Sequence, residues 1–275
     1  MERLFYYNGK MNLSRCFYND KKLRLKKTNA ILVFLLMLFL FNGMPIHAQD
    51  SGINHFNLDL RLKNMHLWQG SVVTPGAMMA TSMEYITSDQ KLIVGVWGGA
   101  GFDGSYKEFS YYTTYRFTDR FQAQLISHNN YSQIENPRIF SYDKYTSPNF
   151  LDFVLSYTVS QRLPLSMLWS TILFGQGGDY VSDTDGTVTD SYSNYVELNY
   201  LFMADRQIQI KAFVGGAFSF FTEKTFYSTS PAIVNLGVTL SQDVTLLNKT
   251  IPVSGTAFWN PESGVGALQI DIMLF

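Results

Sequence analysis

Cysteine and long apolar runs are almost missing from this sequence. The only cysteine is Cys16, which lies in the segment that we expect to be removed on export. The rest of the chain can therefore form neither a disulfide framework nor a thiolate metal site. The longest uninterrupted apolar run covers residues 30–41, which is 12 residues, whereas a membrane-spanning helix needs about 20. These absences argue against a disulfide-stapled domain and against a helical membrane protein.

The amino end has the three parts of an export signal. Basic residues come first (Lys21, Lys22, Arg24, Lys26 and Lys27), the short apolar run follows, and the stretch PIHAQ supplies the small-residue cleavage site. We predict cleavage after Ala48, with residues 1–48 as a signal peptide and residues 49–275 as one domain. Met11 is an alternative start, and it changes nothing after the apolar run.

An excess of basic residues is also missing beyond the signal. The first 48 residues hold 8 of the 21 Lys plus Arg and 2 of the 22 Asp plus Glu. Residues 49–275 therefore carry 21 − 8 = 13 basic and 22 − 2 = 20 acidic residues, a formal net charge near −7. Because phosphate binding needs concentrated Lys and Arg, we expect no nucleic-acid partner.

Sustained helical periodicity is absent after Gln49, and apolar residues recur at every second position instead. The stretches FNLDLRLK, RFQAQLISHNN and YVELNYLF are the clearest cases. The pattern predicts twelve strands, at about 54–67, 77–87, 91–101, 106–117, 120–130, 149–160, 164–174, 191–203, 206–220, 231–241, 250–260 and 264–275. Their lengths exceed the roughly 5 to 6 residues of soluble strands and suit tilted membrane strands, in which about 9 to 11 residues cross the apolar layer.

The connections alternate in length. Tight joins near 88–90, 118–119, 161–163 and 204–205, with a somewhat longer one at 242–249, alternate with loops that are mostly longer and polar. A soluble sandwich could show the same strand alternation, but strand length, 16% aromatic content and the export signal favour apolar faces turned to lipid. We therefore predict an all-β fold, a transmembrane antiparallel barrel of twelve strands in a bacterial outer membrane.

The two ends of the predicted barrel must meet. A sheet cannot leave an open edge in lipid, so the last strand, 264–275, is expected to pair with the first, 54–67. Phe275 would then lie at the periplasmic interface, where the barrel-assembly machinery also reads the terminal strand. Aromatic residues near the second tight turn, such as Tyr115 and Phe117, predict an interfacial girdle.

Alternation also predicts which charged side chains face the lumen. The candidates are Asp59, Arg61, Lys63, Glu84, Glu108, Arg116, His128, Asp152, Glu197, Lys211 and Asp271. Charges are costly in lipid, about 2 to 4 kcal/mol for Lys or Arg at the midplane. Two interpretations stay open: the charges pair into a network that fills the interior, or they line a narrow pore that selects solutes. Four glycines (Gly95, Gly99, Gly215 and Gly237) would favour free volume if they face inward.

Catalytic and metal chemistry find little support. Ser127 and His128 are adjacent and so fall on opposite faces of a strand, which prevents a hydroxyl–imidazole pair of the kind used by lipid-acting barrel enzymes. The stretch SDTDGTVTD has the spacing of a calcium loop only in part, and a solvated turn is the better interpretation. We expect no enzyme activity, no cofactor and no bound metal.

Three stretches resemble the TorF-like family of porins. They are LRLKNMHLWQG, the Gly-rich segment EYITSDQKLIVGVWGGAGFDGSYKEFSYYTTYRF, and SYSNYVELNYLF. Trp68 and Gly70 match the family's aromatic–glycine opening, although Gln69 stands where the family has arginine. The resemblance covers most of residues 54–275 and implies a barrel with a transport role.

The sequence thus predicts a porin-like barrel for passive diffusion of small hydrophilic solutes, with lipid and the assembly machinery as partners. The alternative is a closed barrel that binds other outer-membrane proteins through its loops at 131–148 and 175–190; a lipid-acting enzyme ranks third. We expect no plug domain before the barrel, and therefore no energised uptake.

Overall fold

The computed structural model describes residues 54–160, 162–175, 178–205 and 208–275, and the predicted signal peptide lies outside them. Twelve strands form a closed barrel in which every neighbouring pair is antiparallel. They are β1 (Phe56–Lys63), β4 (Met78–Ile86), β5 (Leu92–Gly101), β6 (Lys107–Thr118), β7 (Phe121–His128), β8 (Phe150–Thr158), β9 (Leu165–Gly175), β12 (Asn194–Ala204), β13 (Ile208–Phe218), β14 (Ala232–Leu246), β15 (Lys249–Asn260) and β16 (Val265–Met273). The predicted fold class and strand number are confirmed.

The alternation of period two places apolar side chains on the outer face. One row of directly paired residues across β13, β14, β15 and β16 is apolar: Ala212, Val238, Ala257 and Leu268. The neighbouring row is polar: Lys211, Thr239, Thr256 and Gln269. Leu268 is 55% exposed and Gln269 only 9%. The apolar face therefore points outward, as a surface that contacts lipid requires.

The connection after β14 is tighter than expected. Alternation suggested a strand end near 241 and a longer join at 242–249, but β14 continues to Leu246, which pairs with Lys249 in β15. Leu247 and Asn248 form a two-residue turn, and both have positive φ angles, 49° and 62°. Two positive φ angles in succession are typical of a type I′ hairpin, whose twist matches that of the strands. The prediction of a longer fifth join was wrong.

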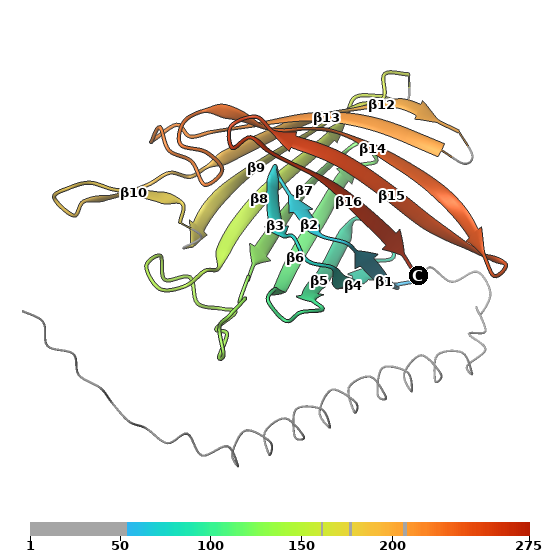
Figure 1. The fold of residues 1–275 in the computed structure, drawn as a ribbon, viewed down its shortest axis with the longest axis horizontal. Helices are drawn as coiled ribbons and strands as arrows, with labels where there is room; N and C mark the ends of the chain where they lie inside the picture. The colour runs from blue at the N-terminus through green and yellow to red at the C-terminus, as the bar shows by residue number, and fades with distance from the viewer. Residues whose placement is uncertain (1–53, 161, 176–177, 206–207) are drawn as a thin grey trace, which may run out of the picture. The chain divides into compact units, whose positions relative to one another are not determined.

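The first strand is shorter than expected because the chain leaves the wall after Lys63. Residues 64–77 carry a small hairpin, β2 (His66–Trp68) and β3 (Ser71–Thr74), before β4 begins at Met78. Lys63 and Met78 are direct partners in the ladder, so the whole excursion begins and ends at one point of the wall. Figure 1 shows the wall strands curling around this hairpin.

A second small hairpin, β10 (Tyr180–Ser182) and β11 (Val188–Asp190), lies in the loop between β9 and β12. It projects from the end of the barrel that carries the longer loops, which we call the loop end (Figure 1). In the part of the chain that the structure describes, no helix is long and apolar enough to cross a membrane.

The barrel closes between β1 and β16, as predicted. Only three residue pairs form the ladder there, from Arg61 opposite Met273 to Lys63 opposite Asp271. The backbone bonds continue beyond it, because Leu60 donates its N–H to the carbonyl of Phe275 at 3.0 Å. The terminal phenylalanine is thus held by the first strand.

Candidate functional site

The β2–β3 hairpin lies inside the barrel and contacts several sides of its wall. Trp68 packs against His128 and Phe150 of the wall and against Phe226 and Tyr227 of the β13–β14 loop, with ring centroids 5.2 to 6.0 Å apart. On the opposite side, Asn260 donates to the carbonyl of Gly70 at 2.9 Å and Leu67 donates its N–H to Gln269 at 3.1 Å. The hairpin therefore narrows the lumen, which the sequence did not predict.

Gln69 and Gly70 form the turn of the hairpin and explain its sequence. Both have positive φ, 44° and 83°. A Cβ on Gly70 would overlap the backbone carbonyl of Val234, so only glycine fits at this position. Gln69 is held at both ends of its amide, by Ser170 and by Tyr227. The motif that resembles the porin family is thus the part of the chain that enters the lumen.

A cavity that we call the barrel cavity lies between the hairpin and strands β5 to β9. Its volume is about 820 Å³, within the range of small-molecule sites. Four aromatic side chains contribute to its lining, and so do the charged or titratable groups Lys63, His66, Glu108, His128 and Asp152. Four of these five groups are predicted lumen residues.

Glu108, His128 and Asp152 form a cluster in this cavity. The two nitrogens of the His128 ring point to different carboxylates: Nδ1 lies 3.6 Å from Glu108 and Nε2 lies 3.9 Å from Asp152. Glu108 also accepts hydrogen bonds from Tyr106 and Ser110. Asp152 is fully buried, and no side chain of the described residues donates a hydrogen bond to its carboxylate, which lies beside the backbone N–H groups of Thr171 and Phe153.

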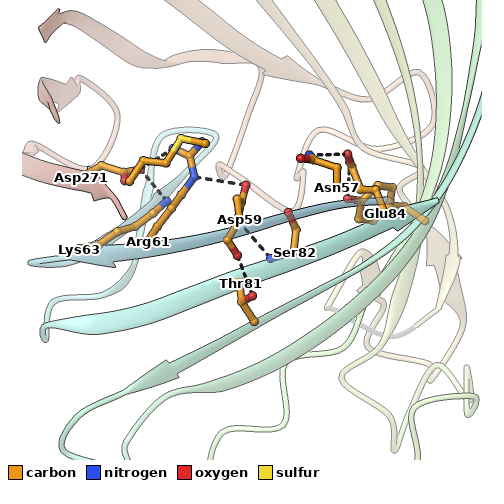
Figure 2. A network of polar contacts seen from close by, with 10 residues as sticks. Asn57, Asp59, Arg61, Lys63, Thr81, Ser82, Glu84 and Asp271 are labelled. Atoms are coloured by element: carbon orange, nitrogen blue, oxygen red, sulfur yellow. Dashed lines mark hydrogen bonds and ion pairs between the residues drawn. The ribbon is translucent and has the colours of Figure 1, made fainter. Parts of the chain in front are cut away.

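A second charged cluster joins the first and last strands (Figure 2). The Oδ2 atom of Asp271 lies 3.3 Å from both Arg61 and Lys63, and Arg61 also lies 3.5 Å from Asp59. Asp59 further accepts a hydrogen bond from the N–H of Ser82 on β4. Four predicted lumen residues therefore pair with one another, as the interior-network interpretation expects.

The remaining candidates are spread over the wall. Glu84 accepts hydrogen bonds from Tyr112 at 2.7 Å and from Asn57 at 3.2 Å. Glu197 and Lys211 line a small cavity of about 150 Å³ against the hairpin. Arg116 is exposed on β6 and belongs to none of the clusters among the described residues.

Sequence reasoning missed several residues that build this site. Phe150 lies two positions before Asp152 in the same strand, so both side chains point to the same side of the sheet. The alternation therefore could have predicted that Phe150 faces the lumen. Phe226 and Tyr227 come from a loop without alternation, and Gln69 from a turn, so no local pattern indicated that they enter the lumen.

The inward glycines do not add free volume. The space beside Gly95 is filled by the ring of Tyr112, beside Gly215 by Tyr195, and beside Gly237 by Phe213. Each of these three glycines is covered by an aromatic ring from the adjoining strand, which supports the ladder in place of a side chain, and the space beside Gly99 is filled by Trp97 of its own strand and by Met78. The expectation that these positions favour an open interior was wrong, because neighbouring rings occupy them.

Changing Gly215 to Val is expected to destabilise the barrel by about 1–3 kcal/mol, since the new Cβ would overlap the Tyr195 hydroxyl and displace the ring. Urea unfolding followed by tryptophan fluorescence measures the loss. Gly255→Val is the matched control, because nothing lies within 4 Å of a Cβ at that position. Equal stability of the two variants would contradict the packing argument.

The residues considered for catalysis and for calcium binding have other partners in the structure. Ser127 bonds to Asn129 and Tyr142, whereas His128 contacts Glu108 and Asp152, so the two neighbours do not form a pair. Asp190 of the suspected calcium loop is bound by Lys144 at 2.9 Å. Among the described residues, no group of three or more His, Cys, Asp or Glu side chains is arranged to hold a metal ion.

The fold and its outward apolar face define a transmembrane antiparallel β-barrel with an internal hairpin. The NanC porin is similar in structure, with a TM-score of 0.45 and 8% identity over 79% of this chain and 98% of that one. Wzi, an outer-membrane protein of Escherichia coli described as a carbohydrate-binding β-barrel, gives a TM-score of 0.32 and 7% identity over 80% of this chain and 56% of that one. No family model and no curated protein matches the sequence, so membership of the TorF-like family stays a prediction.

Proposed function

We propose that the protein is an outer-membrane barrel that lets small hydrophilic solutes cross through a narrow, charged constriction. Two cavities inside the wall support this role. The barrel cavity lies toward the loop end. A second cavity, of about 260 Å³, lies near the opposite end, where tight turns join the strands and which we call the turn end. It is lined by residues of β1, β13, β14, β15 and β16.

The observation that carries the proposal is the ion-paired group between these cavities. Lys63 lines the barrel cavity, while Arg61 and Asp271 line the smaller one, and Asp271 binds both basic side chains. A solute that moves from one cavity to the other must pass these charges. Side chains fill the interior of a barrel of about eight strands, whereas a barrel of about sixteen strands leaves an aqueous channel. A barrel of twelve strands lies between these sizes, which suits a narrow path.

Single-channel conductance of the refolded barrel in a planar bilayer tests the proposal, once heat-shifted gel mobility has verified that the barrel is closed. We expect small, discrete steps. Lys63→Ala should raise the step size, because it removes the side chain that reaches between the cavities. Arg116→Ala, on the exposed end of β6, is the control and should leave the step unchanged.

A second function is favoured by a different observation. Two loops of the loop end are joined by the Lys144–Asp190 ion pair at 2.9 Å and by ring contact between Tyr145 and Tyr180. A fixed loop surface of this kind suits the binding of another outer-membrane protein. A folded barrel that stays silent in the bilayer would favour this second function over diffusion.

A further inference from the structure

We propose that the barrel cavity binds a small organic cation, a solute that carries an ammonium or guanidinium group on a short aliphatic body. This inference deepens the proposed function by naming the class of solute that enters the cavity. Binding can be measured without transport, so the two proposals can fail separately.

The first argument is the carboxylate of Asp152, which no side chain hydrogen-bonds. It is fully buried and lines the cavity, and the donors beside it among the described residues are backbone N–H groups of Thr171 and Phe153. The nearest basic side chain is His128, at 3.9 Å, too far for a hydrogen bond. Because a buried carboxylate without a closely paired cation is costly, the position favours a ligand that brings a positive charge and N–H groups to it.

The second argument is the balance of charge in the cavity. Its titratable and charged groups are Lys63, His66, Glu108, His128 and Asp152. The ammonium of Lys63 is already paired with Asp271 at 3.3 Å. The carboxylates of Glu108 and Asp152 then bracket the one ring of His128, an arrangement that repels anions and attracts cations.

The third argument is that two of the three side-chain amides in the lining already donate to hydroxyl groups. Gln69 donates to Ser170 and Gln124 donates to Thr114, which leaves Asn130 as the third amide. A neutral sugar needs donors as well as acceptors for its hydroxyl groups, whereas an ammonium or guanidinium group needs acceptors only. A neutral polyol therefore fits this lining less well than a cation does.

The fourth argument is the aromatic lining. Trp68, Trp97, Phe150 and Phe226 all contribute to the cavity. Cations bind over the faces of aromatic rings, and most strongly over tryptophan. A carboxylate pair next to tryptophan rings offers an organic cation both an ion pair and a cation–π contact.

Binding of L-arginine to the full barrel in detergent tests the proposal. L-citrulline is the matched ligand, because it replaces the guanidinium with a neutral urea of nearly the same shape. Titration calorimetry and tryptophan fluorescence should show saturable binding of arginine, and a Kd for citrulline weaker by about tenfold or more, as expected for the loss of a charged hydrogen bond. Glucose should bind no better than citrulline.

Two variants connect the effect to the cavity. Asp152→Asn should weaken arginine binding by about tenfold or more and leave citrulline unchanged. Glu108→Gln should also weaken arginine binding. It replaces Asp152→Asn as the test of the cavity if the Asp152 variant does not fold, as judged by the absence of a heat-shifted band. Glu197→Gln is the control, because that carboxylate is held by Asn199 and Asn235 outside the barrel cavity.

Equal affinities for arginine and citrulline, or no saturable binding of either, would overturn the proposal. So would an arginine Kd that neither cavity variant changes. Arginine binding by a barrel that does not conduct would support the cation site and contradict the diffusion function. Conductance without arginine binding would support diffusion and contradict the cation site.

Discussion

Removing the internal hairpin is expected to raise single-channel conductance severalfold while the barrel stays closed. The variant replaces residues 65–77 by a single glycine, so that Asn64 and the new glycine join Lys63 to Met78. These two residues are direct partners in the β1–β4 ladder, and an Asn-Gly turn suits such a two-residue connection. Asn64 is kept because its side chain binds backbone groups of β16.

The physical reason for the large effect is the position of the hairpin. Trp68 fills the space between β7, β8 and the β13–β14 loop, and Gly70 lies against β14 and β15 on the other side. None of these contacts belongs to the wall ladder, so their loss widens the path and spares the closed sheet. Heat-shifted gel mobility measures closure before any conductance is recorded.

The matched control is a deletion of the same design at the second hairpin. Ser182 and Val188 are direct partners, so residues 183–187 can also be replaced by an Asn-Gly turn. This hairpin projects from the loop end (Figure 1), and its shortening should leave conductance unchanged. If the loss of residues 65–77 has no greater effect than this control, the hairpin does not narrow the conducting path.

The barrel wall could be predicted from sequence because its information is local. The alternation of apolar and polar residues within about ten positions indicates both a strand and its apolar face, as in FNLDLRLK. One misplaced wall connection, at 242–249, contains Asp243 and Lys249, polar residues that indicate a loop but pair within the ladder at the turn end. Charge near a strand end does not distinguish a loop from a strand that extends beyond the apolar layer.

The internal hairpin could not be predicted because its information is distant. The segment from His66 to Thr74 is short, and its partners include Gln269, Asn260 and Tyr227, between 158 and 202 residues away in sequence. Whether a loop turns into the lumen depends on the width of the closed barrel and on the rings that receive it. Alternation likewise assigned Glu108 and Asp152 to the inner face, yet only the register of the strands brings His128 between them.

Reversing the charge of Asp271 is expected to destabilise barrel closure by about 3–5 kcal/mol, the usual cost of leaving a buried charge uncompensated. The β1–β16 ladder has only three residue pairs, and Asp271 sits directly opposite Lys63 in it. Asp271→Lys would place a third cation beside Arg61 and Lys63. Lys63 carries most of the cost because its side chain is 13% exposed, whereas that of Arg61 is 35% exposed and is screened by solvent.

Urea unfolding of the barrel in detergent, followed by gel mobility, measures this loss. Asp243→Lys is the control, because Asp243 is exposed near the turn end of β14 and a substitution there should stay within about 0.5 kcal/mol. The double variant Asp271→Lys with Lys63→Asp restores an opposite pair at the same ladder position and should recover part of the stability. A double variant as unstable as the sum of its parts would show that backbone pairing alone holds the first and last strands together.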